Sequence, residues 1–407
     1  TWQDNSPKAK TINPKYVAKH QDLLRTAISK RTPTDGPIIV ETSGGLDSGT
    51  VLAMLARDHN NPLISVSSVH HRQEADLIAA CNDQANVIKH YAQPAKADAI
   101  DDVIELEISS LGYLSSQGLE VQLSIFSKIH QETQARIIYS GFGGDEVITN
   151  MGDRRVMEAF DNRNYLQLWS LIPGHPAKRP FRFIKTLLNK GADPRFRSNI
   201  LNLLELLKET SLLRQRITDQ HGLFERQKRK FLNWAAYRSI NHEIIDYNLP
   251  NPLLQNRFEA HTLMADALGM EFQWPFFDEQ LVQNYLSTPS IEKLGPKTQR
   301  RYLHRRAVKG LVPDIIVDKN DKSAGEPIRT NDGWDEYRRF WISKIETMEA
   351  TFHVEIAHLV DWSKLYSMRD MLVANLGLPM DQNDINAMDG AFKLYSLNIW
   401  YHADGNE

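Results

Sequence analysis

Cysteine is nearly absent from this chain of 407 residues, in which Cys81 is the single thiol. One thiol cannot form a disulfide within the chain, and it cannot supply the several sulfur ligands of a structural metal site. Such sparse use of cysteine is typical of proteins in a reducing compartment. We therefore expect a cytoplasmic protein whose chemistry does not depend on thiols.

Long apolar runs and an excess of one charge are also missing. No run of about 18 apolar residues occurs, so the sequence predicts no membrane-spanning helix. The 48 Lys and Arg residues face 51 Asp and Glu residues, a net charge of −3 that gives no general attraction to nucleic acid. We expect neither a membrane nor nucleic acid among its partners. With 41% hydrophobic and 24% charged residues, a globular chain of two or three folding units is indicated.

Short apolar runs alternate with helical patterns in the first 150 residues. The runs lie at 38–40, 63–69, 86–91 and 136–140, and the helical patterns at 16–30, 47–57, 73–84 and 123–133. This alternation predicts an α/β fold with a doubly wound parallel sheet. Farther along, strand-like runs become scarce and helical patterns occupy 224–245, 261–269 and 278–286. We divide the chain into a helical lead-in (1–36), a sheet domain (37–150) and a mostly helical region (151–407).

A glycine-rich turn joins the first predicted strand to the helix that follows it. Its sequence is Ser43-Gly44-Gly45-Leu46-Asp47-Ser48. Paired glycines let backbone N–H groups approach an anion, and the helix start adds unpaired donors and the positive end of its dipole. A carboxylate in such a turn suits a magnesium ion beside a polyphosphate. An ordinary capped turn is the alternative, but the whole hexamer favours phosphate binding.

A second glycine-rich segment also follows a predicted strand, and it reads Ser140-Gly141-Phe142-Gly143-Gly144-Asp145-Glu146. The carboxyl ends of parallel strands meet at one edge of a sheet, so the two segments can face one ligand. Asp145 then offers a second carboxylate to the metal, and two carboxylates with phosphate oxygens form the usual surroundings of Mg²⁺. Together the segments predict a site for a magnesium-bound polyphosphate.

These motifs resemble a known family. The first segment lacks the Gly-Lys-Ser/Thr ending of a Walker loop and is similar to the PP-loop of enzymes that cleave ATP to AMP and pyrophosphate. The second resembles the Ser-Gly-x-Gly-Gly/Ala-Asp-Glu segment of the asparagine synthetase family. A third, ending in Pro275-Phe276-Phe277-Asp278, is similar to that family's Pro-Phe-Leu-Asp, and basic residues follow in the family's order to about residue 330.

The resemblance implies a PP-loop fold, like that of the adenine-nucleotide α-hydrolases, and a role for each matching residue. Asp47 and Asp145 would bind Mg²⁺, and Lys322 would neutralise charge on the phosphates and on the tetrahedral intermediate. Arg301 stands where a second lysine is common, and its guanidinium favours bidentate phosphate contacts. The residues that would contact ATP are Ser43, Gly44, Gly45, Leu46, Asp47, Ser48, Ser140, Gly141, Gly143 and Gly144.

Two departures from the family bear on the substrate. Glutamine-using asparagine synthetases begin with a nucleophilic cysteine on an amidohydrolase domain, whereas this sequence begins with Thr1 and carries Cys81 inside the predicted sheet domain. We therefore expect the amine to come from outside this chain. Asparagine synthetases commonly have Glu, and β-lactam synthetases Tyr, where this chain has Phe142, a residue that cannot transfer a proton.

Together these departures favour an ATP-dependent ligase that adenylates a carboxylate and transfers it to a larger amine. The branch that they resemble is the lasso-peptide macrolactam synthetases, in which the amine of a precursor peptide attacks a side-chain carboxylate. Such an enzyme would have the precursor peptide and an associated protease as partners. An asparagine-forming domain that lacks its glutaminase and a β-lactam-forming ligase remain alternatives, as does a catalytically silent nucleotide-binding subunit. A tRNA-modifying enzyme fits poorly, because it would have a basic surface and catalytic cysteines.

Overall fold

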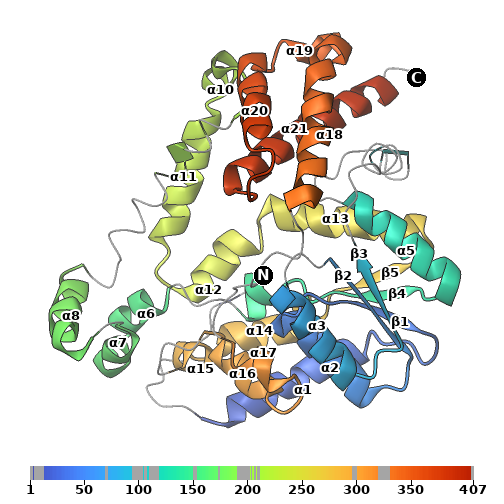
Figure 1. Cartoon of the computed structure of the whole chain (residues 1–407). Coiled ribbons are helices and arrows are strands. Elements are labelled where there is room, and N and C mark those ends of the chain that lie inside the picture. Colours follow the sequence, from blue (N-terminus) through green and yellow to red (C-terminus); the bar gives the residue numbers. More distant parts are fainter. Residues whose placement is uncertain are drawn as a thin grey trace.

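A five-stranded parallel sheet forms the centre of the fold (Figure 1). The computed structural model describes residues 13–68, 72–93, 119–149, 154–172, 175–189, 211–295, 300–319 and 331–404, with a few single positions between them. The strands are β1 (Ile38–Glu41), β2 (Leu63–Ser68), β3 (Lys89–Gln93), β4 (Ile137–Tyr139) and β5 (Glu271–Gln273), in the order β3-β2-β1-β4-β5. The predicted doubly wound parallel sheet is therefore confirmed.

Both faces of the sheet are covered by helices, which explains its apolar strands. On β1, Ile38 and Val40 belong to a core shared with α1 (Lys15–Ser29), α2 (Leu46–Asp58), α14 (Glu279–Ser287) and α16 (Tyr302–Val308). Ile39 points to the opposite core, which α5 (Leu119–Thr133) and α13 (Pro252–Ala267) complete. The alternation follows from the two-residue period of a strand. Helix α3 (Arg72–Gln84) connects β2 to β3 along the chain.

Strand β5 is a part of the sheet that we did not expect, because it lies in the range assigned to the helical region. It pairs with β4 in the register Ile138↔Phe272, and this pairing makes β5 an edge strand of the sheet. Three residues are too few for a pattern to be read from sequence, and the partner strand is far away along the chain. The division of the chain into three parts stays a prediction.

The other elements beyond residue 150 are helices, as expected. The predicted helix at 224–245 is wrong in its continuity. Helix α11 (Leu223–Ala236) ends early, and extended backbone at Tyr237 and Ser239 separates it from α12 (Ile240–Glu243). Most of the leucine-rich segment 201–213 lies outside the described residues. The remaining elements are η2 (Gly144–Ile148), α6 (Arg155–Asp161), α7 (Tyr165–Leu171), η3 (Pro176–Lys178), α8 (Arg179–Leu188), α10 (Gln215–Gln220), α11 (Leu223–Ala236), α12 (Ile240–Glu243), η4 (Ile244–Asn248), η5 (Pro275–Phe277), α15 (Ser290–Leu294), α17 (Asp314–Val317), α18 (Asn331–Thr351), α19 (Val354–Ala357), α20 (Trp362–Ala374) and α21 (Gln382–Asp404).

The last helices form a core of their own, above α13 in the view of Figure 1. Trp341 and Ile345 of α18 pack there against residues of α20 and α21 such as Leu365 and Ala391. Within the described part of the chain, no helix is both long and apolar enough to cross a membrane.

A buried arginine joins α18 to the connection between α20 and α21. Arg338 is fully buried and donates to Asp335 at 2.7 Å and to Asp384 at 2.5 Å, and it also donates to the Leu378 carbonyl. Arg338→Met should lower the free energy of unfolding by about 3–5 kcal/mol, because it leaves buried carboxylates without their cation. Urea denaturation would measure this, with Arg339→Met at an exposed position of the same helix as the control. A loss equal to that of the control would contradict the prediction.

Candidate active site

The first glycine-rich segment connects β1 to α2 as predicted. Gly44 adopts φ +63°, a conformation that favours glycine, and a Cβ there would lie 2.8 Å from the Cβ of Leu77 on α3. Gly45 precedes the first residue of α2, so the unpaired N–H groups of that helix point out of its N-terminus. The hydroxyls of Ser43 and Ser48 lie 3.2 Å apart beside them. The loop therefore has the donors that a phosphate requires.

The second glycine-rich segment follows β4, and it meets the first because β4 pairs directly with β1. A Cβ on Gly141 would lie 2.6 Å from the backbone nitrogen of Ser48, and a Cβ on Gly144 would lie within 2.6 Å of both carboxylate oxygens of Asp47. The glycines thus permit a close approach of two loops that the sequence places about a hundred residues apart. Glu146 accepts a hydrogen bond from the Gly143 N–H at 3.1 Å, which caps the short helical turn η2.

Asp47 and Asp145 come together as predicted, with Arg301 between them. Arg301 Nη1 lies 3.0 Å from Asp47 Oδ2, and its Nη2 contacts Asp145 Oδ1. The other oxygen of Asp47 accepts a hydrogen bond from Thr149 at 2.8 Å. Arg301 is the residue just before α16 and has φ +57°, an unusual conformation for a residue with a side chain, and it is 7% exposed. We expected its guanidinium to face phosphate, whereas it is paired here with both metal-binding candidates.

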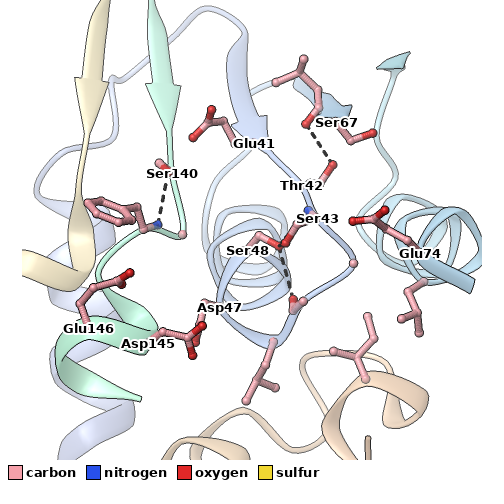
Figure 2. Close-up of a pocket in the computed structure, with 18 of the residues that line it drawn as sticks. Glu41, Thr42, Ser43, Asp47, Ser48, Ser67, Glu74, Ser140, Asp145 and Glu146 are labelled. Carbon is pink, nitrogen blue, oxygen red and sulfur yellow. Dashed lines mark hydrogen bonds between the residues drawn. The ribbon is translucent and has the colours of Figure 1, made fainter. Parts of the chain in front are cut away.

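A cavity of about 510 Å³ opens between the two loops, a size typical of small-molecule sites (Figure 2). Figure 2 shows Asp47 and Asp145 at one end of it, Glu41 beside Ser140 at the other, and Glu74 on α3. Basic residues line it as well, namely Arg257, Arg300, Arg301, Arg305 and Lys319. The phosphate loop therefore faces several cations, which suits a polyanionic ligand.

Two histidines behind the phosphate loop, His304 and His20, are neutral. Burial lowers the pKa of His304 well below its usual value, so this ring is uncharged although its Nε2 lies 4.0 Å from Asp47 Oδ1. Burial also lowers the pKa of His20, which bonds to His304, to about 4. Arg305 is held by backbone carbonyls, among them that of Lys319 at 2.5 Å. The positive charge near Asp47 therefore comes from arginine rather than from histidine.

Phe142 lines the cavity and belongs to a cluster of aromatic rings. The ring centroids of Phe258, Trp274 and Phe277 each lie 5.8 Å from that of Phe142. The guanidinium carbon of Arg257 lies 4.1 Å from the centre of the same ring, a cation–π contact. Phe142 therefore has an apolar ring that packs against other aromatic rings and carries one cation, Arg257, on its face.

Magnesium fits the two carboxylates without further protein ligands. Among the residues that the structure describes, no group of three acidic, histidine or cysteine side chains surrounds a possible metal position. Mg²⁺ is commonly held by one or two carboxylates together with phosphate oxygens and water. Asp47 and Asp145, both in the pocket wall, therefore match a metal that binds together with a nucleotide.

Eight of the ten residues expected to contact ATP line one cavity, whereas Gly143 and Gly144 are not part of its lining. Their role in binding ATP stays a prediction. Lys322 lies outside the described residues, and its role also stays a prediction. Arg301 is in the cavity, and its catalytic role also stays a prediction. Glu41, Gln122, Arg257 and Arg300 line the same cavity and were not expected. Glu41 had one available signal, since it is a charged residue directly after a β-branched run.

Comparison with protein families gives a match over most of the chain. The model of the family described as asparagine synthase matches residues 19–368 of the chain. This range contains both glycine-rich segments, the aromatic cluster and the basic residues of the cavity. A search of curated proteins found no match.

Proposed function

The chain belongs to the asparagine synthase family of ATP-dependent ligases that form carbon–nitrogen bonds, and on this premise we propose that it activates a carboxylate as an acyl-adenylate and transfers it to the amine of a peptide, closing a macrolactam. The observation that carries the peptide as substrate is the aromatic ring of Phe142 in the lining of the cavity, where it packs against three further rings. Aromatic rings gain free energy by covering the apolar surface of a large substrate. Ammonium has no such surface.

Magnesium-bound ATP supplies the phosphorus centre for the carboxylate to attack and pyrophosphate as the leaving group. The chain's own part is to bind and orient the substrates and to neutralise negative charge on the phosphates. Backbone N–H groups at the start of α2 and the hydroxyls of Ser43 and Ser48 would hold the phosphates, and Asp47 and Asp145 would hold the metal. Arg300 and Lys319 would offset negative charge from the opposite wall. The cavity walls would keep water from the activated carboxyl group.

The first half of the reaction has a direct test. Labelled pyrophosphate should enter ATP only when the chain, Mg²⁺ and a suitable carboxylate are present together. A precursor peptide with a free amine and an internal Asp or Glu would be tried first, followed by aspartate. ATP binding without exchange for any carboxylate would indicate the silent nucleotide-binding subunit instead.

The identity of the product shows whether the substrate is a peptide or the amino acid aspartate. Incubation with ATP and a precursor peptide that has a free amine and an internal Asp or Glu should lower the peptide mass by one water, which mass spectrometry detects. Formation of asparagine from aspartate and ammonium at a comparable rate would contradict the macrolactam proposal. It would support the asparagine-forming alternative.

A further inference from the structure

Five carboxylates line the cavity, and they are held in different ways. Asp47 and Asp145 are paired with Arg301, and Glu146 accepts the Gly143 N–H. Glu74 stands on α3, on the side of the phosphate loop away from β4 (Figure 2). Glu41 is the last residue of β1, and its carboxylate lies beside Ser140. The proposed roles for phosphate and metal do not use Glu41.

Ser140 lies beside Glu41 at the start of the second loop (Figure 2). Its hydroxyl oxygen accepts a hydrogen bond from the Phe142 N–H at 3.2 Å. The hydroxyl favours the ionised form of Glu41. A carboxylate has about four lone-pair positions, so Glu41 can accept a proton donor from a ligand in the cavity that it lines.

The surroundings of Glu41 also suit a base. Burial is the largest influence and raises the pKa of its carboxyl group, while the Ser140 hydroxyl and the positive charge of Arg257 act in the opposite direction. A carboxylate with a raised pKa takes up a proton more readily near neutral pH than one in water. Arg257 is itself stacked on Phe142, and Glu41, Arg257 and Phe142 all line the cavity.

We propose that Glu41 accepts the proton that the amine loses when it attacks the activated carboxyl group. The inference rests on the proposed function. In this step the amine nitrogen forms a bond to the acyl carbon, and the bond from that carbon to the phosphate oxygen breaks, with its electron pair leaving on AMP. One proton moves from nitrogen to the Glu41 carboxylate, which becomes a neutral acid. That proton passes to water when the amide leaves.

The location of Glu41 is consistent with this step. Both β1 and β4 end at the same edge of the sheet, which places Glu41 beside the loop that carries Phe142 and Asp145. Phe142 has no group that can take a proton, and the carboxylates paired with Arg301 are bound to a cation. Glu41 combines an available acceptor position with access to the cavity.

Glu41→Gln tests the proposal, because glutamine keeps the shape of the side chain but cannot take up a proton. Pyrophosphate exchange with the carboxylate that supports it in the wild type should stay within about 3-fold. Water loss from the peptide should fall by about 10²–10⁴-fold, the usual contribution of a general base. Hydroxylamine is a stronger nucleophile than the peptide amine and depends less on proton removal during its attack, so trapping of the activated carboxyl group by hydroxylamine should be affected much less.

Two further variants complete the test. Glu259→Gln makes the same change at an exposed position of α13 and should leave both half-reactions at wild-type rates. Glu41→Asp keeps the carboxylate and should retain more peptide cyclisation than Glu41→Gln. Equal losses in exchange and cyclisation, or equal rates for the Asp and Gln variants, would overturn the role of Glu41. Absence of exchange in the wild type would instead refute the proposed function, and this inference with it.

Discussion

Asp47→Asn should reduce ATP–pyrophosphate exchange by about 10³-fold or more. The substitution removes one of the two carboxylates that we propose to hold the metal. Metal-assisted charge stabilisation is worth several kcal/mol, with each ~1.4 kcal/mol corresponding to tenfold in rate. The amide that replaces the carboxylate can still accept from Thr149, which bonds to Asp47 at 2.8 Å. The fold should therefore persist while the chemistry is lost. Exchange rates measured over a range of Mg²⁺ concentrations would show both the loss and a weaker response to the metal.

The control for this variant is Asp22→Asn on the exposed side of α1, which should exchange at the wild-type rate. Asp145→Asn should act in the same direction as Asp47→Asn, because both carboxylates contact Arg301. If Asp47→Asn kept more than a tenth of the exchange rate with an unchanged magnesium dependence, Asp47 would not be a metal ligand.

Gly141→Ala should lower the exchange rate by about 10²-fold and the free energy of unfolding by about 1–3 kcal/mol. The new methyl group would lie 2.6 Å from the Ser48 nitrogen and 2.8 Å from its Cα. Both atoms are backbone atoms at the start of α2, so the strain cannot be relieved by turning a side chain. The two loops must move apart, and the donors for phosphate move away from the second loop.

Gly269→Ala separates this steric effect from the general cost of replacing glycine. Gly269 has φ +66° with nothing near the position of a Cβ, so alanine there should cost about 1–2 kcal/mol of stability and no activity. Urea denaturation and exchange would be measured on both variants. Equal exchange in the Gly141→Ala variant and the wild type would show that the loops tolerate separation.

The sequence was sufficient to predict the segments in which structure and chemistry are local. The β-branched run at 38–40, the glycine pair and the helical pattern after them identify one strand–turn–helix unit, and the structure has β1 and α2 within one residue of the predicted bounds. The same reasoning located β4 and the loop that follows it. A doubly wound sheet then implies that both loops lie at its carboxyl edge, which β1–β4 pairing confirms.

Features that depend on pairing between distant segments could not be predicted in this way. Strand β5 has three residues, and its structure depends on hydrogen bonds to β4. Arg257 comes from the middle of α13 and meets Phe142 only because α13 covers the same side of the sheet. The bridge from Arg301 to Asp47 and Asp145 likewise joins three segments whose separation in the chain carries no pattern.

That bridge has a consequence for the order in which ligands enter. A divalent cation that binds Asp47 and Asp145 must take over two contacts made by a guanidinium, so a bare ion gains little by the exchange. An ion that arrives with a polyphosphate also brings a new partner for Arg301, because guanidinium pairs well with phosphate oxygens. One arginine thereby couples the entry of the metal to the entry of the nucleotide. Metal and nucleotide would then bind as a single unit rather than one after the other.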